Sequence, residues 1–362
     1  MTAPSPSRRP RVAFVFPNPR AELAAAVAAG DAPDSTLLGQ NHMGPHDIES
    51  RLHDPWLTRH VRDGSPLHRA AWSLREVMLP FELTHADAVF TPLAALFPLT
   101  ARVRRLPVVV VNYGLCLIHE RAGTQRRRLL AANLRAAHSV VCLGESQRLQ
   151  LIEQTGIAPE RVSTVRLGID AAWFTPRPGP ETTGSQEGPE VLAVGKDLAR
   201  DYRTFVEALG PLDARAHIAG YRRNVTGLDL PGNVAQGDMP IGELRDAYAR
   251  AACVVVPQFR DGYPYGSEGG GLTALLEAMA MGRPLVVTDR GIMRDYVSDG
   301  VEALVVPPED PTALREAIAR VLGDRALAAR LGAAARRRVE TGLRSQDFAS
   351  GIAPLLRRAA GS

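Results

Sequence analysis

A glycine-rich loop followed by a short helix contains the residues whose types and spacing best suit ligand binding. Residues 269–271 are three consecutive glycines, flanked by apolar runs of strand length at 252–257 and 284–288. A strand, a glycine-rich loop, a helix and a strand make a βαβ unit, in which amides at the start of the helix face an anion. Thr273 and Glu277 are four residues apart and share one helical face. Phosphate at the helix tip and sugar hydroxyls beside Glu277 together describe a nucleotide diphosphate.

The same stretch also allows an ordinary interpretation, in which a flexible loop precedes a buried helix and Glu277 faces solvent. We expect the helix to begin near Leu272 and to end at Gly282, because glycine suits a C-terminal cap and Pro284 cannot continue a helix. The predicted buried stripe recurs at steps of three and four and consists of Leu272, Leu275, Leu276 and Met279. A lone glycine-rich loop is a weak signal, so both interpretations stay open on this stretch alone.

Strand-like and helix-like segments alternate along the 362 residues, which are enough for two domains. In the first half we expect strands at 11–16, 88–90, 108–111, 139–142 and 161–166 and helices at 22–29, 124–137 and 146–155. The second half repeats the rhythm with strands at 190–194 and 216–219 and helices at 202–209, 241–252, 310–321 and 326–340. This alternation predicts an α/β protein with two doubly wound, Rossmann-like parallel sheets.

A stretch rich in Pro, Gly, Thr and Glu separates the two halves. The predicted organisation is therefore an N-terminal domain at 1–172, a linker at 173–189, a second domain at 190–344 and a last helix at 345–362 that returns to the first domain. Ligands bind at the carboxyl ends of parallel strands, so we expect a cleft where those ends of both sheets face each other.

The net charge of +4 originates in the first half, which has 20 arginines against 15 acidic residues up to Ala172. Arg126, Arg127 and Arg128 form one cluster. Such a surface suits an anionic acceptor or peripheral contact with the inner face of a membrane, and the alternative is a solvated helix face. Nucleic-acid binding is not expected, because no aromatic platform or known module accompanies the arginines.

Cys116, Cys142 and Cys253 occur in apolar contexts without metal-ligand spacing. They predict buried free thiols in a reducing compartment. The histidines between residues 42 and 60 have no fixed spacing either, so no metal site is expected. We see no signal peptide and no apolar run long enough to span a bilayer, and we expect a cytoplasmic location.

Lys196 is the sole lysine among 43 basic residues. Such a bias toward arginine indicates a GC-rich genome, in which a retained lysine is a candidate for a role that needs a compact ammonium. Chance retention is the alternative.

Several blocks in a fixed order make residues 135 to 350 resemble the family 4 glycosyltransferases, which have the GT-B fold. The blocks are VCLGES at 141–146, GIAPERV at 156–162, LGID at 167–170, VGK at 194–196, RDY at 200–202, PGNV at 231–234, YARAA at 248–252, LEAMA at 276–280, GRP at 282–284 and VVPPEDP at 305–311. Residues 1–130 match only in strand rhythm, as expected of a half that binds a variable acceptor.

The resemblance implies a nucleotide-sugar donor held by the second domain and transfer with retention of configuration, without a metal or other cofactor. Lys196 and Arg200, which follow Gly195, correspond to the cations that contact the donor diphosphate and stabilise it as it departs. Glu277 corresponds to the acid that binds the ribose. The loop that offers amides to the diphosphate and sugar corresponds to Gly270, Gly271, Leu272 and Thr273. Residues 236–238 lie where family members contact the base, mostly through backbone.

The chain departs from the family pattern at two positions. Gly269 occupies the position of a glutamate near the reacting carbon, and Glu268 either replaces that glutamate or is an ordinary loop acid. Tyr113 occupies the position of a histidine in the first domain, with His119 a little downstream. A tyrosine can hydrogen-bond a sugar hydroxyl but supplies no base at neutral pH. Glu268 and Tyr113 are our candidate catalytic residues.

These features predict a retaining hexosyltransferase that moves a sugar from a nucleotide diphosphate sugar to a hydroxyl of a glycan, a lipid-linked molecule or a small molecule. The missing glutamate and histidine motivate an alternative, a catalytically silent GT-B protein that binds a nucleotide and supports a partner. A third reading is a GT-B sugar-nucleotide epimerase, which forms product without an acceptor.

Overall fold

The computed structural model describes residues 8–55, 66–176 and 189–361. The chain divides into two compact units. Unit 1 comprises Met1–Ala29, Asp34–Val165 and Ser345–Ser362, and unit 2 comprises Gly30–Pro33 and Arg166–Arg344. Most of the predicted linker, residues 177–188, lies outside the described residues.

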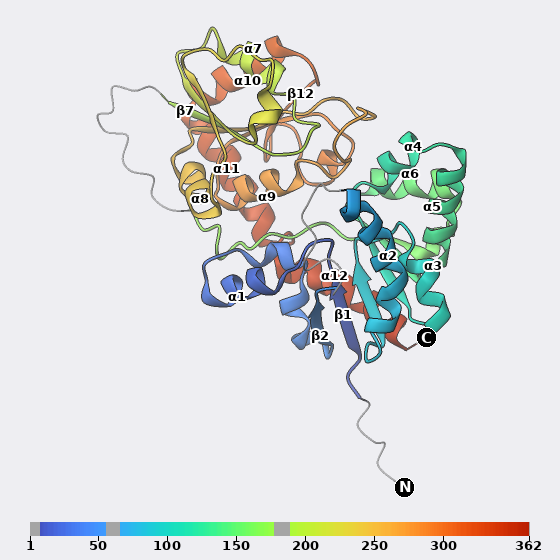
Figure 1. The fold of residues 1–362 in the computed structure, drawn as a ribbon. Coiled ribbons are helices and arrows are strands. Elements are labelled where there is room, and N and C mark those ends of the chain that lie inside the picture. The colour runs from blue at the N-terminus through green and yellow to red at the C-terminus, as the bar shows by residue number, and fades with distance from the viewer. Residues whose placement is uncertain (1–7, 56–65, 177–188, 362) are drawn as a thin grey trace. The chain divides into compact units, whose positions relative to one another are not determined.

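Unit 1 contains a parallel sheet of six strands (Figure 1). In sheet order these are β2 (Glu49–His53), β1 (Arg11–Val15), β3 (Ala88–Thr91), β4 (Val108–Asn112), β5 (Ser139–Cys142) and β6 (Val162–Thr164). Its helices are α1 (Ala21–Ala29), α2 (Pro66–Glu82), α3 (Phe97–Ala101), α4 (Leu115–Arg121), α5 (Thr124–Ala136), α6 (Glu145–Thr155) and α12 (Ser345–Ala360). The central strands are continuous apolar runs, as parallel strands covered on both faces require.

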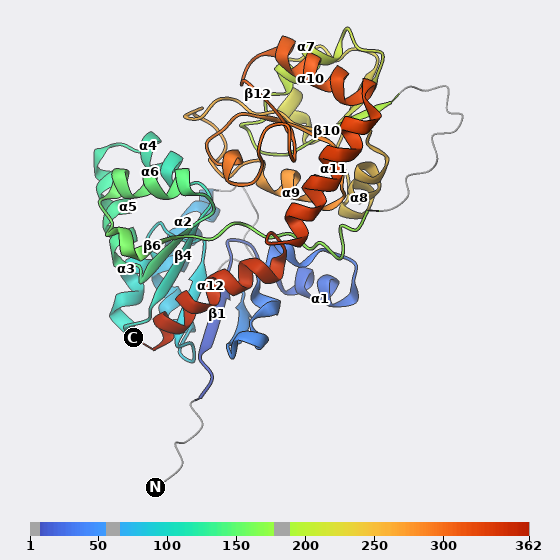
Figure 2. The same ribbon diagram turned by 180° about the vertical axis from the view of Figure 1, so that it is seen from behind.

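Helices cover both faces of this sheet. The core on one face includes Leu79 of α2, Leu134 of α5 and the strand residues Val89, Val110 and Val140. On the other face α12 packs against β1, β3, β4 and β5, and Figure 2 shows it running across these strands. Phe348 of α12 meets Phe90 of β3 with ring centroids 6.4 Å apart. The last helix therefore belongs to the first unit, as the sequence predicted.

Unit 2 contains a second parallel sheet of six strands. In sheet order these are β12 (Leu304–Val306), β11 (Leu285–Thr288), β10 (Cys253–Val256), β7 (Glu190–Val194), β8 (Arg215–Ala219) and β9 (Val234–Gly237). Its helices are α7 (Tyr202–Leu209), α8 (Ile241–Arg250), α9 (Leu272–Ala280), α10 (Pro311–Gly323) and α11 (Arg325–Glu340). When the strands of unit 2 are numbered along the chain, the spatial order of its sheet is that of the sheets that bind dinucleotides. The predicted doubly wound fold is therefore confirmed.

The strands β2, β9 and β12 and the helices α2, α3 and α4 were not predicted. All three strands lie at sheet edges. The strand β2 is mostly polar and β9 is only four residues long and ends in Gln236 and Gly237, so the apolar alternation that marks a strand is weak in both. The helix α2 contains Pro80, which argued against a helix from sequence. The three cysteines are buried and free, as predicted. In the part of the chain that the structure describes, every helix is too short or too polar to cross a membrane.

Candidate active site

The carboxyl ends of β7 and β10 bring the predicted donor-binding residues of unit 2 together. These strands are neighbours, but the chain continues from β7 to β8 on one side and from β10 to β11 on the other. Ligands bind in the crevice that such a reversal creates. Gly195 and Lys196 directly follow β7, and residues 257–271 connect β10 to α9. The two loops are joined where the amide of Phe259 donates to the carbonyl of Ala199 at 3.0 Å.

Arg200 is a buried cation in this crevice. Its side chain is 6% exposed, and its Nε and Nη1 have no hydrogen-bond partner among the described residues. The guanidinium lies over Gly195, where φ is +150° and a Cβ would overlap Nε. The hydroxyl of Tyr202 donates to the carbonyl of Gly195 at 2.7 Å and holds this residue in place. A buried guanidinium with free donors is suited to bind an anion, because unpaired buried N–H groups are costly.

Lys196 forms an ion pair with Asp238. The distance from its Nζ to Oδ1 is 2.5 Å, and Nζ lies 4.7 Å from the centroid of the Tyr221 ring. Both charged side chains are about half-exposed, so water screens the pair. An ammonium held in this way is oriented, and it can exchange Asp238 for a phosphate at little cost.

Gly271 begins α9, as the glycine-rich loop predicted. Its φ is +96°, and a Cβ there would lie 2.8 Å from Oε1 of Gln258, so only glycine fits. Gln258 is 1% exposed, and its Nε2 donates to the carbonyl of Gly270 at 2.6 Å. Its Oε1 has no partner in the described chain. Sequence reasoning missed Gln258, whose one signal was an amide two positions after a buried strand.

Two of the four loop amides assigned to the donor are used within the loop. The amides of Gly270 and Leu272 donate to carbonyls three residues earlier, at 3.0 and 3.4 Å. The amides of Gly271 and Thr273 have no acceptor among the described residues. The side chain of Thr273 is exposed in the first turn of α9. The amides left for a ligand are therefore those of Gly271 and Thr273.

Glu277 is buried, which rules out the interpretation that it lies on a solvated helix face. Its side chain is 6% exposed, and Oε2 accepts a hydrogen bond from the hydroxyl of Tyr248 at 2.8 Å. Burial raises the pKa of Glu277 to about 7, although the Tyr248 bond and the charge of Arg200 both lower it. The charge of Arg200 is felt at Glu277, as expected if both groups contact one ligand.

Tyr248 is the second residue that sequence reasoning did not assign. It is fully buried on α8, and burial together with the charge of Glu277 raises its pKa far above the ordinary value. Its ring lies edge-on to Phe174 with centroids 6.4 Å apart, which fixes the hydroxyl beneath the acid. The only signal was its place in the YARAA block.

Comparisons with known proteins show which family and which folds the chain resembles. Residues 229–338 match the family described as Glycosyl transferases group 1. The chain is similar to the D-inositol 3-phosphate glycosyltransferase of Thermobifida fusca, with 28% identity over 225 residues that cover 55% of this chain and 50% of that protein. The chain spans about half the length of the curated relatives it matches.

Two solved structures align over nearly the whole chain. The sucrose-phosphate synthase of Thermosynechococcus elongatus has a TM-score of 0.75 and 20% identity, and the alignment covers 98% of this chain and 100% of that one. Anabaena HepE, solved in complex with UDP-glucose, has a TM-score of 0.70 and 14% identity, with 96% and 99% covered. The chain has the GT-B fold.

Glu268 precedes the three glycines of this GT-B chain and is half-buried. Its neighbour Ser267 donates to Oδ2 of Asp197 at 3.3 Å, and Oδ1 of Asp197 accepts from the amide of Ala199 at 2.7 Å. Asp197 thereby ties the glycine-rich loop to the loop after β7. The role of Glu268 near the reacting carbon stays a prediction.

Tyr113 follows β4 in unit 1 and is half-buried. Burial raises the pKa of its phenol well above the ordinary value, and the charge of Arg20 opposes this rise. Arg20 packs over the ring of Phe16, with its Cζ 5.2 Å from the centroid, and its Nε has no partner in the described chain. Tyr113 is a neutral hydrogen-bond donor at pH 7, and its role in catalysis stays a prediction.

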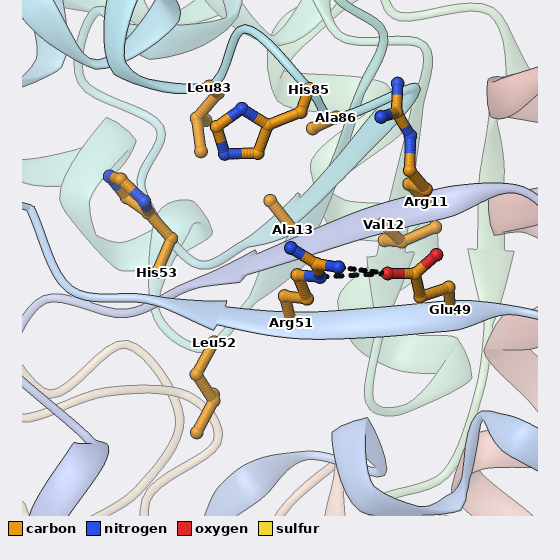
Figure 3. A pocket seen from close by; sticks show the side chains of 10 residues that line it. All are labelled: Arg11, Val12, Ala13, Glu49, Arg51, Leu52, His53, Leu83, His85 and Ala86. Atoms are coloured by element: carbon orange, nitrogen blue, oxygen red, sulfur yellow. Dashed lines mark hydrogen bonds and ion pairs between the residues drawn. The ribbon is translucent and has the colours of Figure 1, made fainter.

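A pocket in unit 1 lies over β1 and β2, and none of the predicted site residues lines it (Figure 3). It is lined by Arg11, Val12, Ala13, Glu49, Arg51, Leu52, His53, Leu83, His85 and Ala86. Arg51 pairs with Glu49 at 2.6 Å, and His53 lies 2.9 Å from Glu82. Its charges therefore compensate one another. No cluster of His, Cys, Asp and Glu suited to a metal occurs in the described ranges.

Proposed function

We propose that the chain is a retaining glycosyltransferase of the family 4 type, which transfers a hexose from a nucleotide diphosphate sugar to an acceptor hydroxyl. One observation carries the proposal: at the β7–β10 crevice, Arg200 is buried with two nitrogens that lack a partner among the described residues, and Glu277 is buried on the helix that follows the glycine-rich loop. The family match and the names of the relatives support glycosyl transfer, and the UDP-glucose bound to HepE supports a nucleotide-sugar donor.

The donor would be held by groups that the site leaves unpaired. Arg200 and the amides of Gly271 and Thr273 would bind the diphosphate, with Lys196 exchanging Asp238 for a phosphate oxygen. The ionised Glu277 would accept hydrogen bonds from the ribose hydroxyls. Unit 2 is thus the proposed donor-binding domain, and unit 1 the proposed acceptor-binding domain.

The chemistry needs stabilisation of the leaving group. The bond between the anomeric carbon and the diphosphate oxygen breaks, and the acceptor oxygen forms a bond to the same face of that carbon. Negative charge grows on the leaving phosphate, where Lys196 and Arg200 stabilise it. The acceptor's proton passes to that phosphate, so a neutral Tyr113 does not prevent the reaction.

A thermal-shift screen across nucleotides and nucleotide sugars, followed by turnover with the ligands that bind, tests the proposal. A ligand that binds the folded state raises Tm. We expect a nucleotide diphosphate to stabilise the wild type and not Arg200→Gln, with the exposed neighbour Arg203→Gln as the matched control. Added EDTA should leave turnover unchanged, because the two cations supply the charge.

Three outcomes distinguish the candidate functions. Transfer to an acceptor or hydrolysis of the donor supports the transferase. Nucleotide binding without turnover, across a broad set of acceptors, favours the silent partner protein. A new sugar nucleotide formed without acceptor identifies an epimerase.

A further inference from the structure

The second half of α2, residues 74–82, has an apolar exposed face. Between residues 74 and 81 every exposed side chain is apolar, and these recur at steps of three and four as Leu74, Val77, Met78 and Phe81. They are between 40% and 51% exposed. A helix that faces water normally shows polar residues on this side, so the pattern of α2 is inverted.

Arg75 and Glu76 of α2 are buried and have defined partners. Nη1 of Arg75 donates to the carbonyl of Pro17 at 2.7 Å. Oε2 of Glu76 accepts from the amides of Leu96 and Phe97 at the start of α3, at 2.6 and 2.8 Å. Rotating α2 to bury its apolar face would break these bonds and expose Leu79 of the core. The apolar face therefore stays outward.

A basic turn contacts α2. The 3₁₀ helix η5 (Arg102–Arg104) contacts α2, and Figure 1 shows α2 next to α3, which leads into η5. Val103 is 74% exposed. Arg104 and Arg105 are exposed, and neither has a carboxylate partner among the described residues. The surface therefore combines an apolar stripe with uncompensated positive charge.

We propose that α2 and η5 form a docking surface for an anionic lipid membrane. The α2–η5 surface consists of Leu74, Val77, Met78, Phe81, Val103, Arg104 and Arg105. Apolar side chains of such a surface enter the headgroup boundary while arginines pair with lipid phosphates. Charge complementarity selects this occupant over a second copy, because a symmetric dimer through this surface would bring its own arginines together. Membrane docking is independent of the proposed glycosyl transfer.

Co-sedimentation of the full chain with vesicles tests this surface. We expect binding to vesicles that contain 30% phosphatidylglycerol and weak binding to pure phosphatidylcholine, with loss at high salt. The double variant Val77→Glu, Phe81→Glu should lose nearly all binding. Ile118→Glu, Leu149→Glu adds the same charge at exposed apolar positions of α4 and α6 and should bind like the wild type.

A second pair of variants tests the charge. Arg104→Gln, Arg105→Gln should weaken binding to the anionic vesicles by about fivefold for each arginine. Arg126→Gln, Arg128→Gln changes the exposed cluster on α5 that the sequence singled out, and it should bind like the wild type. Unchanged Tm and nucleotide binding in all variants separate this test from that of the proposed function.

Three results would overturn the proposal. The first is no binding to anionic vesicles, and the second is equal loss in the α2 variant and its α4–α6 control. The third is a dimer that dissociates in Val77→Glu, Phe81→Glu while vesicle binding is absent, which would assign the surface to a second copy.

Discussion

The two units share one architecture but differ in the side chains at the crevice where the strand order reverses. In unit 1 the reversal falls between β1 and β3, where Arg75 donates to the carbonyl of Pro17 and the hydroxyl of Thr91 accepts from the amide of Leu93. In unit 2 it falls between β7 and β10, where Arg200 has two nitrogens without partners. The fold provides the crevice in both units, and the loop residues decide which polar groups it presents, Nε of Arg20 in unit 1 and Nε and Nη1 of Arg200 in unit 2.

Two buried acids sharpen the comparison. Glu76 of unit 1 accepts two backbone amides, so its charge is compensated within the protein. The bond that Glu277 of unit 2 accepts comes from one neutral hydroxyl, and its pKa is raised to about 7. Glu76 is suited to stabilise the fold, whereas Glu277 can still accept hydrogen bonds from a ligand.

The largest effect should come from the cations of unit 2. Lys196→Ala should lower kcat about 100- to 1,000-fold, because the departing diphosphate loses a fixed charge. Asp238→Asn removes the partner that competes with the phosphate, so its donor affinity should equal or exceed that of the wild type. Steady-state kinetics measure both. Equal loss in the two variants would mean that the ion pair acts structurally.

The next largest effect should distinguish Glu277 from Glu76. Glu277→Gln should raise the donor KM about 10- to 100-fold, whereas Glu76→Gln should leave it unchanged and destabilise the fold by about 2 kcal/mol. Because the pKa of Glu277 is raised, its protonated form is favoured in the folded state, and stability falls as pH rises from 4.5 through about 7. Glu277→Gln should therefore be more stable than the wild type above pH 7, by up to about 3 kcal/mol.

The pH dependence of donor binding follows from the same group. Ribose hydroxyls require the carboxylate, so the donor KM of the wild type should rise as pH falls below about 7. Glu277→Gln should lose this dependence. Kinetics and thermal melts at pH 6 and pH 8 measure both trends, and a Glu277→Gln melt that matches the wild type at pH 8 contradicts the assignment.

A smaller effect is expected at Tyr248. Tyr248→Phe removes the hydroxyl that lowers the pKa of Glu277, so the midpoint of the donor KM profile should move to higher pH and the KM at pH 7 should rise about tenfold. A loss of kcat at every pH with an unmoved midpoint would indicate damage to packing instead.

The smallest effect concerns the acceptor side. Arg20 has a free Nε and acts on Tyr113, so Arg20→Gln should raise the acceptor KM about fivefold and leave donor hydrolysis unchanged. Arg51→Gln is the control, since Arg51 bonds Glu49 at the sheet edge. A change in donor hydrolysis would contradict the division of roles between the units.

Local sequence determined most elements and the identity of the chemical groups. The valine runs of β4 and β10, the start of α9 at Leu272 and the span of α12 follow from propensity and capping, which act over a few residues. Glu277 was singled out by its spacing from the glycines, whereas the roles of Lys196 and Arg200 came from the family resemblance, and all three roles stay predictions.

Only the tertiary structure decided which groups meet. The bond from Tyr248 to Glu277 joins residues 29 apart, and Gln258 reaches Gly270 across a loop. The inverted face of α2 depends on Arg75 and Glu76, whose partners lie on other elements. Periodicity shows that a residue is apolar or charged, but packing between distant segments decides whether its charge is compensated.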